Sequence, residues 1–243
     1  VNLRPVTWTT RQRRILLGLL LAVSLLFLLG LSYQRNGGWQ GILNAVKGPP
    51  RVGLQIGHLE AGRHPEELAN LRYSTGASVN GVNEVDVNFA VAEILRDMLV
   101  NEGVVVELLP ATVPQGYRAD LFVSLHADSS EDRERRGYKS AVFRYERNDK
   151  DALLKQIIDA NYFYFSGLPD DDNNVSGSML EYYAFNHERF KHSVHPKTPA
   201  MIVEMGYISN AEDLAFLEDP VNPAYALKIG ILSYLREVGR IKE

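Results

Sequence analysis

One long apolar run lies near the start of the chain. Residues 15–32 carry no charge and include only two serines. As a helix they would reach roughly 27 Å, about the thickness of a bilayer core. Four arginines precede the run, and the positive-inside rule therefore places the N-terminus in the cytoplasm and the chain from residue 33 onward outside. We predict a basic cytoplasmic segment at 1–14, a transmembrane helix at 15–33, a linker at 34–50 and a folded body at 51–243.

The apolar run allows two kinds of export signal. Gly30-Leu31-Ser32 is a weak small-x-small cleavage site of the sort that ends a signal peptide. The run is longer than the usual core of a signal peptide, which favours a retained membrane anchor over a cleaved leader. A buried core helix is disfavoured, since such helices rarely lack polar residues on every face. The body is membrane-anchored on the outer side in the favoured case and secreted if the segment is cleaved.

The body alternates short apolar runs with stretches of helical periodicity. The clearest helix is at 85–102, where Val87, Val91 and Leu95 share one face. Further helices are predicted at 151–166 and 223–238, and strands at 51–57, 104–109, 121–125, 141–145 and 201–205. This order predicts a single three-layer α/β domain with a twisted, mostly parallel sheet flanked by helices.

Charge and composition exclude several function classes. Residues 1–50 hold six basic residues and no acidic ones, which leaves 20 Lys and Arg against 30 Asp and Glu in 51–243, a net charge of −10. An acidic body disfavours nucleic acid as the partner, because phosphate binding needs a basic face. The absence of cysteine excludes disulfides, a CxxC redox site, Cys-ligated zinc and a cysteine nucleophile.

Four side chains suited to metal chemistry stand at the ends of predicted elements. His58 and His126 end the first and third strands, Glu84 opens the long helix, and Glu204 lies in the late apolar strand. Function gathers at the carboxyl ends of strands in such sheets. Two His and one Glu form a known catalytic zinc set that leaves a position for water, and a further carboxylate can move the proton. Spacing alone does not prove the site.

At these positions the sequence resembles a known family. The residues that carry the resemblance are Gly57-His58, the stretch from Asn83 to Ala92, Ala119–Asp128 with its SLHAD motif, and Pro199–Asn210 with PAMIVEMGYISN. They are similar to the zinc-dependent N-acetylmuramoyl-L-alanine amidases of the bacterial cell wall, over residues 51 to 238. The resemblance implies that His58, Glu84 and His126 hold Zn²⁺ and that Glu204 is the catalytic acid/base. It also implies a single α/β domain that cleaves the amide between the lactyl group of N-acetylmuramic acid and L-alanine of the stem peptide.

Two stretches depart from the family's pattern. The family usually has an Asp-Pro-Gly-His-Gly-Gly type turn at the first ligand, whereas this chain has Gln55-Ile-Gly-His-Leu-Glu60. The turn geometry and a contact behind the ligand are therefore expected to differ. Residues 59–83 form a long loop that we expect to shape the substrate groove.

Other polar clusters are assigned structural roles. These are the remaining histidines at 64, 187, 192 and 195, the acidic turn 170–174, which lacks the glycine and terminal Glu of an EF-hand loop, and the aromatic group 162–165, which is expected to pack. Two alternative functions stay open: a non-catalytic peptidoglycan-binding relative, and a zinc hydrolase acting on a different amide or peptide. The expected partners are peptidoglycan and, through the N-terminal helix, a membrane; no motif identifies a protein activator.

Overall fold

The structure is a computed structural model that describes residues 9–36, 46–145 and 147–242. It divides into two units, Val1–Gly48 and Pro49–Glu243, which we describe separately. Most of the predicted linker at 34–50 lies outside the described residues.

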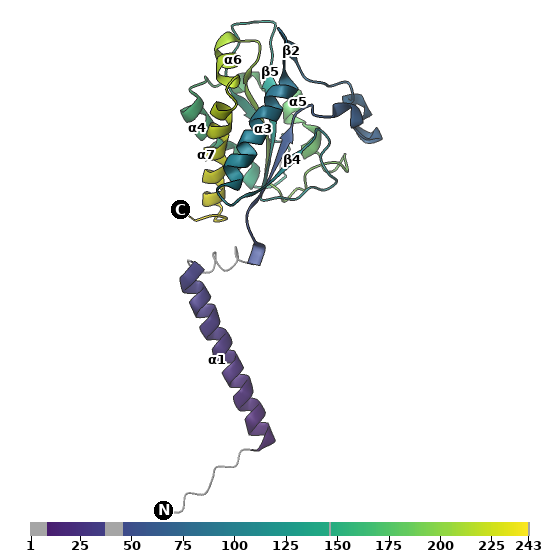
Figure 1. Cartoon of the computed structure of the whole chain (residues 1–243). Helices are drawn as coiled ribbons and strands as arrows, with labels where there is room; N and C mark the ends of the chain where they lie inside the picture. The colour runs from purple at the N-terminus through teal and green to yellow at the C-terminus, as the bar shows by residue number, and fades with distance from the viewer. Residues whose placement is uncertain (1–8, 37–45, 146, 243) are drawn as a thin grey trace, which may run out of the picture. The chain divides into compact units, whose positions relative to one another are not determined.

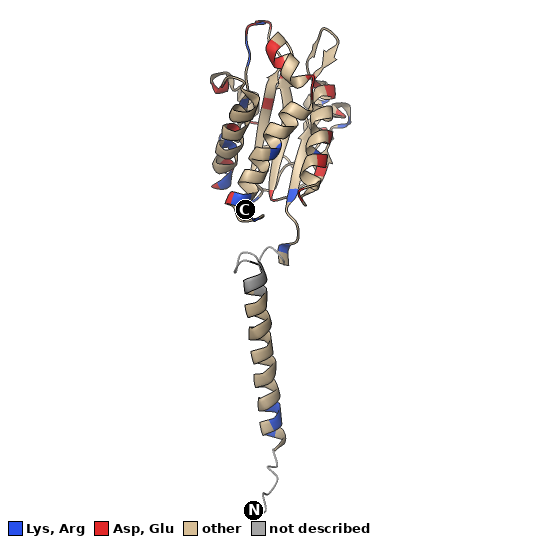
Figure 2. Cartoon of the chain, turned by 60° about the vertical axis from the view of Figure 1, so that its left-hand side comes forward, with Lys and Arg blue, Asp and Glu red and all other residues tan. Residues whose placement is uncertain are grey.

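The N-terminal unit contains one long helix, α1 (Thr10–Asn36). Thr9 caps its start: the Thr9 Oγ1 accepts from the Gln12 amide at 3.3 Å and Gln12 Oε1 accepts from the Thr9 amide at 2.9 Å. Arg11, Arg13 and Arg14 lie in its first turns, and residues 15–34 carry no charge (Figure 2). By length and composition Thr10–Leu31 could cross a membrane, and its apolar side chains are exposed.

The second unit is built on a five-stranded sheet in the order β4-β1-β5-β7-β6. The strands are β1 (Arg51–Ile56), β4 (Val105–Leu109), β5 (Leu121–Asp128), β6 (Lys139–Ala141) and β7 (Ala200–Tyr207). Neighbours pair in parallel except at the edge, where β6 runs antiparallel to β7. This is the α/β fold with a mostly parallel sheet that the sequence predicts.

Three long helices cover one face of the sheet: α3 (Glu84–Val100), α4 (Lys150–Ser166) and α7 (Val221–Glu237) (Figure 1). Alternate strand residues point to them, so that Leu121, Val123 and Leu125 of β5 join the same apolar cluster as Met201 and Val203 of β7. Gly167 ends α4 in the left-handed conformation, as a C-terminal glycine commonly does.

The opposite face is covered by short elements and loops. They include η1 (Ala61–Arg63), η2 (Glu66–Leu71), η3 (Asp172–Asn174), α5 (Gly177–Leu180) and η4 (Tyr183–Phe185). Phe122 and Ile202 from the sheet pack there with Leu68 and Phe185. The predicted loop at 59–83 is therefore structured: it contains η1, η2 and a small hairpin of β2 (Ser78–Val79) and β3 (Val82–Asn83). The short helix α6 (Ala211–Leu217) follows β7.

The fourth strand is the one element that the sequence misplaces. It was expected at 141–145, but β6 pairs with β7 only over Lys139–Ala141. The Ala200 amide at the start of β7 is bound by Asp151 Oδ1 at 2.8 Å, and the Arg144 amide turns to the Leu180 carbonyl at 2.9 Å. A longer β6 would have to pair with the Ala200 amide, which Asp151 already binds.

Candidate metal centre

A row of residues crosses the sheet near its carboxyl edge, on the face away from the three long helices. His126 of β5 is the register partner of Glu204 of β7, and Glu204 is the partner of Lys139 of β6. Partners in register point to the same face, so the three side chains lie side by side. On the other side of His126 stands Gly57, where an added Cβ would fall 2.4 Å from the His126 ring. Glycine at this position makes room for the imidazole.

Glu84 reaches the same place from the first residue of α3. Its Oε1 lies 2.9 Å from His126 Nδ1 and 3.2 Å from His58 Nε2. Its Oε2 accepts from the Ala77 amide at 2.9 Å, and this holds the carboxylate against the turn before the hairpin. A carboxylate is also stabilised at a helix N-terminus by the helix dipole. The hairpin and the helix start therefore fix Glu84 between the two histidines.

His58 follows β1 in a tight turn with a left-handed backbone, φ 66°. Its Nδ1 lies 2.7 Å from the Ser74 carbonyl oxygen. When the Nδ1–H donates to this carbonyl, Nε2, 3.2 Å from Glu84 Oε1, is the ring nitrogen left to bind a metal. A backbone carbonyl behind one ring nitrogen is the usual way in which proteins fix the tautomer and orientation of a metal-ligating histidine.

His58, Glu84 and His126 thus offer three ligand atoms within 4.8 Å of one another. His126 Nε2 is buried and has no hydrogen-bond partner among the described residues. The donor set, two imidazoles and a carboxylate, and this unpartnered nitrogen both fit a divalent metal such as zinc. The three predicted ligands are therefore brought together.

The electrostatics of these three groups reflect their mutual contacts. Burial lowers the pKa of His58, but the hydrogen bond and negative charge of Glu84 outweigh it, and the net pKa is raised. Burial raises the pKa of Glu84, and the hydrogen bonds and charges of the two histidines reverse this, so that its pKa lies far below the ordinary value. Glu84 is therefore ionised and complements positive charge.

Glu204 has a different environment from Glu84. Its Oε2 is buried with no hydrogen-bond partner among the described residues. Burial, together with the negative charges of Glu84 and Asp128, raises the pKa of Glu204 well above its ordinary value. Two carboxylates whose pKa values are driven apart are typical of sites where one binds and the other moves protons.

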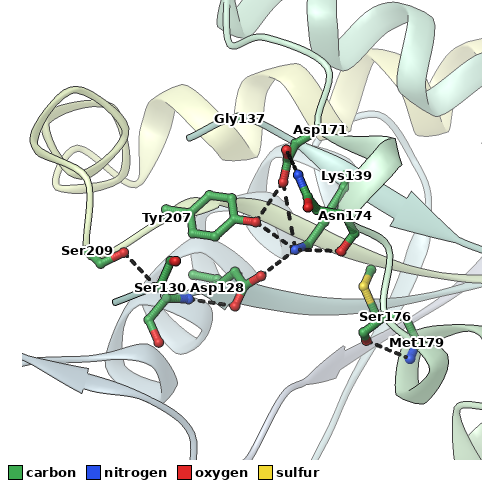
Figure 3. A network of polar contacts seen from close by, with 12 residues as sticks. Asp128, Ser130, Gly137, Lys139, Asp171, Asn174, Ser176, Met179, Tyr207 and Ser209 are labelled. Carbon is green, nitrogen blue, oxygen red and sulfur yellow. Dashed lines mark hydrogen bonds and ion pairs between the residues drawn. The ribbon is translucent and has the colours of Figure 1, made fainter. Parts of the chain in front are cut away.

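Buried Lys139, next to Glu204 in this row of residues, forms three hydrogen bonds (Figure 3). Lys139 Nζ donates to Asp128 Oδ2 at 2.5 Å, to the Tyr207 hydroxyl at 2.7 Å and to the Asn174 carbonyl at 3.2 Å. The Tyr207 hydroxyl in turn donates to Asp171 Oδ2 at 2.6 Å. The acidic stretch 170–174 therefore supplies part of the counter-charge of Lys139 through Asp171.

A cavity of about 610 Å³ opens over the site and includes His58, His126 and Glu204 in its lining. One wall is the 67–74 segment and the other runs from Ser176 to Phe190. The predicted groove-shaping loop thus contributes a wall.

The sequence analysis did not predict the second wall, residues 176–190. Its aromatic residues, Tyr182, Tyr183 and Phe190, could have indicated a packed surface at the site. Tyr182 packs edge-on against the His126 ring, with centroids 5.9 Å apart. Its hydroxyl donates to Gln55 Oε1 at 2.9 Å and accepts from Ser124 Oγ at 3.3 Å. Gln55, at the departure from the family's turn, is therefore a buried support for this wall.

The histidines assigned structural roles lie outside the cavity lining. His64 is buried and contacts Thr112 Oγ1 through Nδ1 at 2.8 Å, while His192 Nδ1 lies 2.6 Å from Glu67 Oε1. In the aromatic group 162–165, Tyr162 is buried, whereas Tyr164 is 81% exposed. Packing therefore accounts for only part of that group.

The fold and site together define an α/β protein with a candidate His/Glu/His metal centre at the carboxyl edge of a parallel sheet. A family model described as N-acetylmuramoyl-L-alanine amidase matches residues 52–232. The chain belongs to this amidase family. A search of the curated protein sequences finds no match.

Solved structures of amidases share the fold. The catalytic domain of CwlV from Bacillus (Paenibacillus) polymyxa var. colistinus is 22% identical, with a TM-score of 0.53, over 76% of this chain and 98% of that one. AmiC2 of Nostoc punctiforme is 20% identical, with a TM-score of 0.53, over 78% and 98%. CwlD from Clostridioides difficile, solved in complex with the GerS lipoprotein, is 19% identical, with a TM-score of 0.52, over 77% and 99%.

Proposed function

We propose that this protein hydrolyses the amide bond between the lactyl group of N-acetylmuramic acid and L-alanine of peptidoglycan stem peptides, and that it depends on zinc. The observation that carries the proposal is the convergence of His58, Glu84 and His126 at a cavity whose lining includes both histidines and Glu204. Membership of the amidase family supports the choice of bond.

In this proposal His58, Glu84 and His126 would hold the zinc ion. Zinc supplies a Lewis acid for the amide carbonyl and lowers the pKa of water toward about 7. The Ser74 carbonyl and the Ala77 amide keep two of the ligands oriented, so little rearrangement is needed to bind the ion.

Glu204 is the proposed catalytic acid/base. It lies next to His126 across the strand pair, lines the cavity and has an oxygen without a protein partner. In its ionised form it takes a proton from the attacking water as the carbon–oxygen bond forms. It then gives a proton to the alanine nitrogen as the carbon–nitrogen bond breaks. The products are a free lactyl carboxylate and a stem peptide with a free amino terminus.

The proposed site of action is outside the cytoplasmic membrane. The apolar helix α1 would anchor the protein through residues 15–33, with 1–14 cytoplasmic and 34–50 as the tether. Residues 51–243 would form the catalytic domain and face the peptidoglycan; cleavage after the helix would leave this domain secreted. Because the body is acidic and the wall is anionic, tethering keeps the two together better than general attraction does.

The test is digestion of purified peptidoglycan by the full chain in detergent, with mass spectrometry of the soluble products. We expect stem peptides with a free L-alanine amino group, loss of the product on chelation, and recovery when zinc is restored. Binding without any product from zinc-replete, folded protein would indicate a non-catalytic relative. Products with other new amino termini would indicate a hydrolase of a different amide.

A further inference from the structure

The cavity beside the candidate metal centre contains charged groups that are nearly all paired within the protein. Three carboxylates of its lining each contact a basic side chain: Glu67 with His192 at 2.6 Å, Asp128 with Lys139 at 2.5 Å, and Glu181 with Arg144 at 2.9 Å. Each of these carboxylates thus has a partner within the protein, although the Arg144–Glu181 pair is exposed.

Besides the buried Glu204, Arg189 is the charged residue of the described lining that has no such partner. Among the described residues it is the one Arg or Lys that lines the cavity, and no ion pair joins its guanidinium to a described carboxylate. Its Cζ lies 5.0 Å from the centre of the Phe190 ring, which also lines the cavity. The ring supports the guanidinium without neutralising it, so the wall presents an uncompensated positive charge.

The loop that carries Arg189 is fixed on both sides. The Arg189 and Phe190 amides donate to the Asn186 carbonyl at 3.2 and 3.0 Å. Just beyond, the Lys191 and His192 amides donate to the Glu67 carboxylate at 3.2 and 2.8 Å. Glu67 belongs to the opposite wall, so this contact ties the two walls together and holds the arginine at the cavity before a ligand arrives. Such preorganisation lowers the cost of binding.

We propose that Arg189 is a specificity-determining residue that binds a carboxylate of the stem peptide while the lactyl–alanine amide lies at the metal centre. The inference rests on the proposed function. On the two sides of that amide, the sugar offers hydroxyl and acetamido groups, whereas the peptide carries carboxylates. A guanidinium matches a carboxylate with two parallel hydrogen bonds, and an unpaired arginine facing the cavity selects the charged side of the substrate.

The test compares two synthetic substrates: a muramoyl-L-alanyl-γ-glutamyl peptide with free carboxylates, and the same peptide with carboxamides in their place. Full-length wild type, Arg189→Gln, Arg189→Lys and Lys191→Gln are assayed with both. Lys191→Gln is the matched control, because it removes a positive charge from the same loop at a residue outside the cavity lining. We expect Arg189→Gln to raise KM for the carboxylate substrate about tenfold, with kcat unchanged, since a hydrogen bond to a charged group is worth about that factor.

The carboxamide substrate should show the higher KM with wild type and no further change in Arg189→Gln. Arg189→Lys should recover part of the loss, and Lys191→Gln should match wild type. Equal effects of Arg189→Gln on both substrates would overturn the assignment and indicate a structural role. Equal cleavage of both substrates by wild type would overturn it while leaving the proposed function intact. No cleavage of either by zinc-loaded wild type would contradict the proposed function itself.

Discussion

Gly57 is the position where the packing of the metal centre can be tested most sharply. The Cβ of a Gly57→Ala variant would fall 2.4 Å from His126 Cε1 and 2.6 Å from both ring nitrogens. Carbon atoms in contact are about 3.5 Å apart or more, so the ring has to move by about 1 Å. A displacement of about 1 Å in a catalytic site costs about 100-fold in rate. We expect a comparable loss of kcat/KM and a 10- to 100-fold weaker zinc affinity, in line with other disturbances around metal ligands.

The assay measures kcat/KM for release of free L-alanine amino groups, zinc affinity by competition with a chromogenic chelator, and unfolding by urea. Overpacking of this kind also costs about 1–3 kcal/mol of stability. Gly62→Ala is the matched control, since an added Cβ there meets nothing within 4 Å. Wild-type zinc affinity and rate in Gly57→Ala would refute the placement of the His126 ring against Gly57.

Three further predictions concern stability. Glu60 has a left-handed backbone, φ 58°, which strains every residue but glycine. In urea unfolding, Glu60→Gly should therefore be more stable than the equally uncharged Glu60→Gln by about 0.5–1 kcal/mol. Equal stability of the two variants would contradict backbone strain at this position. Lys139 has a side chain only 4% exposed, and Lys139→Met should therefore cost about 3 kcal/mol in the same experiment by leaving Asp128 without its counter-charge, whereas wild-type stability would show that the pair contributes nothing. Zinc at about 100 times its Kd should add about 2.7 kcal/mol to the unfolding free energy of the metal-free protein, and an unchanged unfolding curve would contradict binding to the folded site.

Local sequence pattern was enough to predict most of the sheet and the elements that carry the four site residues. The apolar runs at 121–125 and 201–205 predict the strands that carry His126 and Glu204, and Glu84 begins its helix as expected. The register that makes His126 and Glu204 neighbours depends on pairing between strands distant in the chain, which no local pattern specifies.

The cavity walls were harder to predict for the same reason. Arg189 and Tyr182 lie in a segment without strong periodicity, and only the fold brings them to the site. The misplaced strand at 141–145 has the apolar and aromatic residues of a strand, but Asp151 binds the Ala200 amide of its partner strand. Local pattern cannot reveal such a competing hydrogen bond, because Asp151 lies on α4.

The most direct test of the central claim compares zinc-loaded wild type with Glu204→Gln on purified peptidoglycan. Glutamine keeps the shape of the buried side chain and removes its ability to move a proton. We predict one zinc ion per chain in both proteins, stem peptides with free L-alanine amino termini from wild type, and a rate lower by about 10²–10⁴-fold in the variant. A Glu204→Gln protein that binds zinc and releases the same product at nearly the wild-type rate would contradict the account.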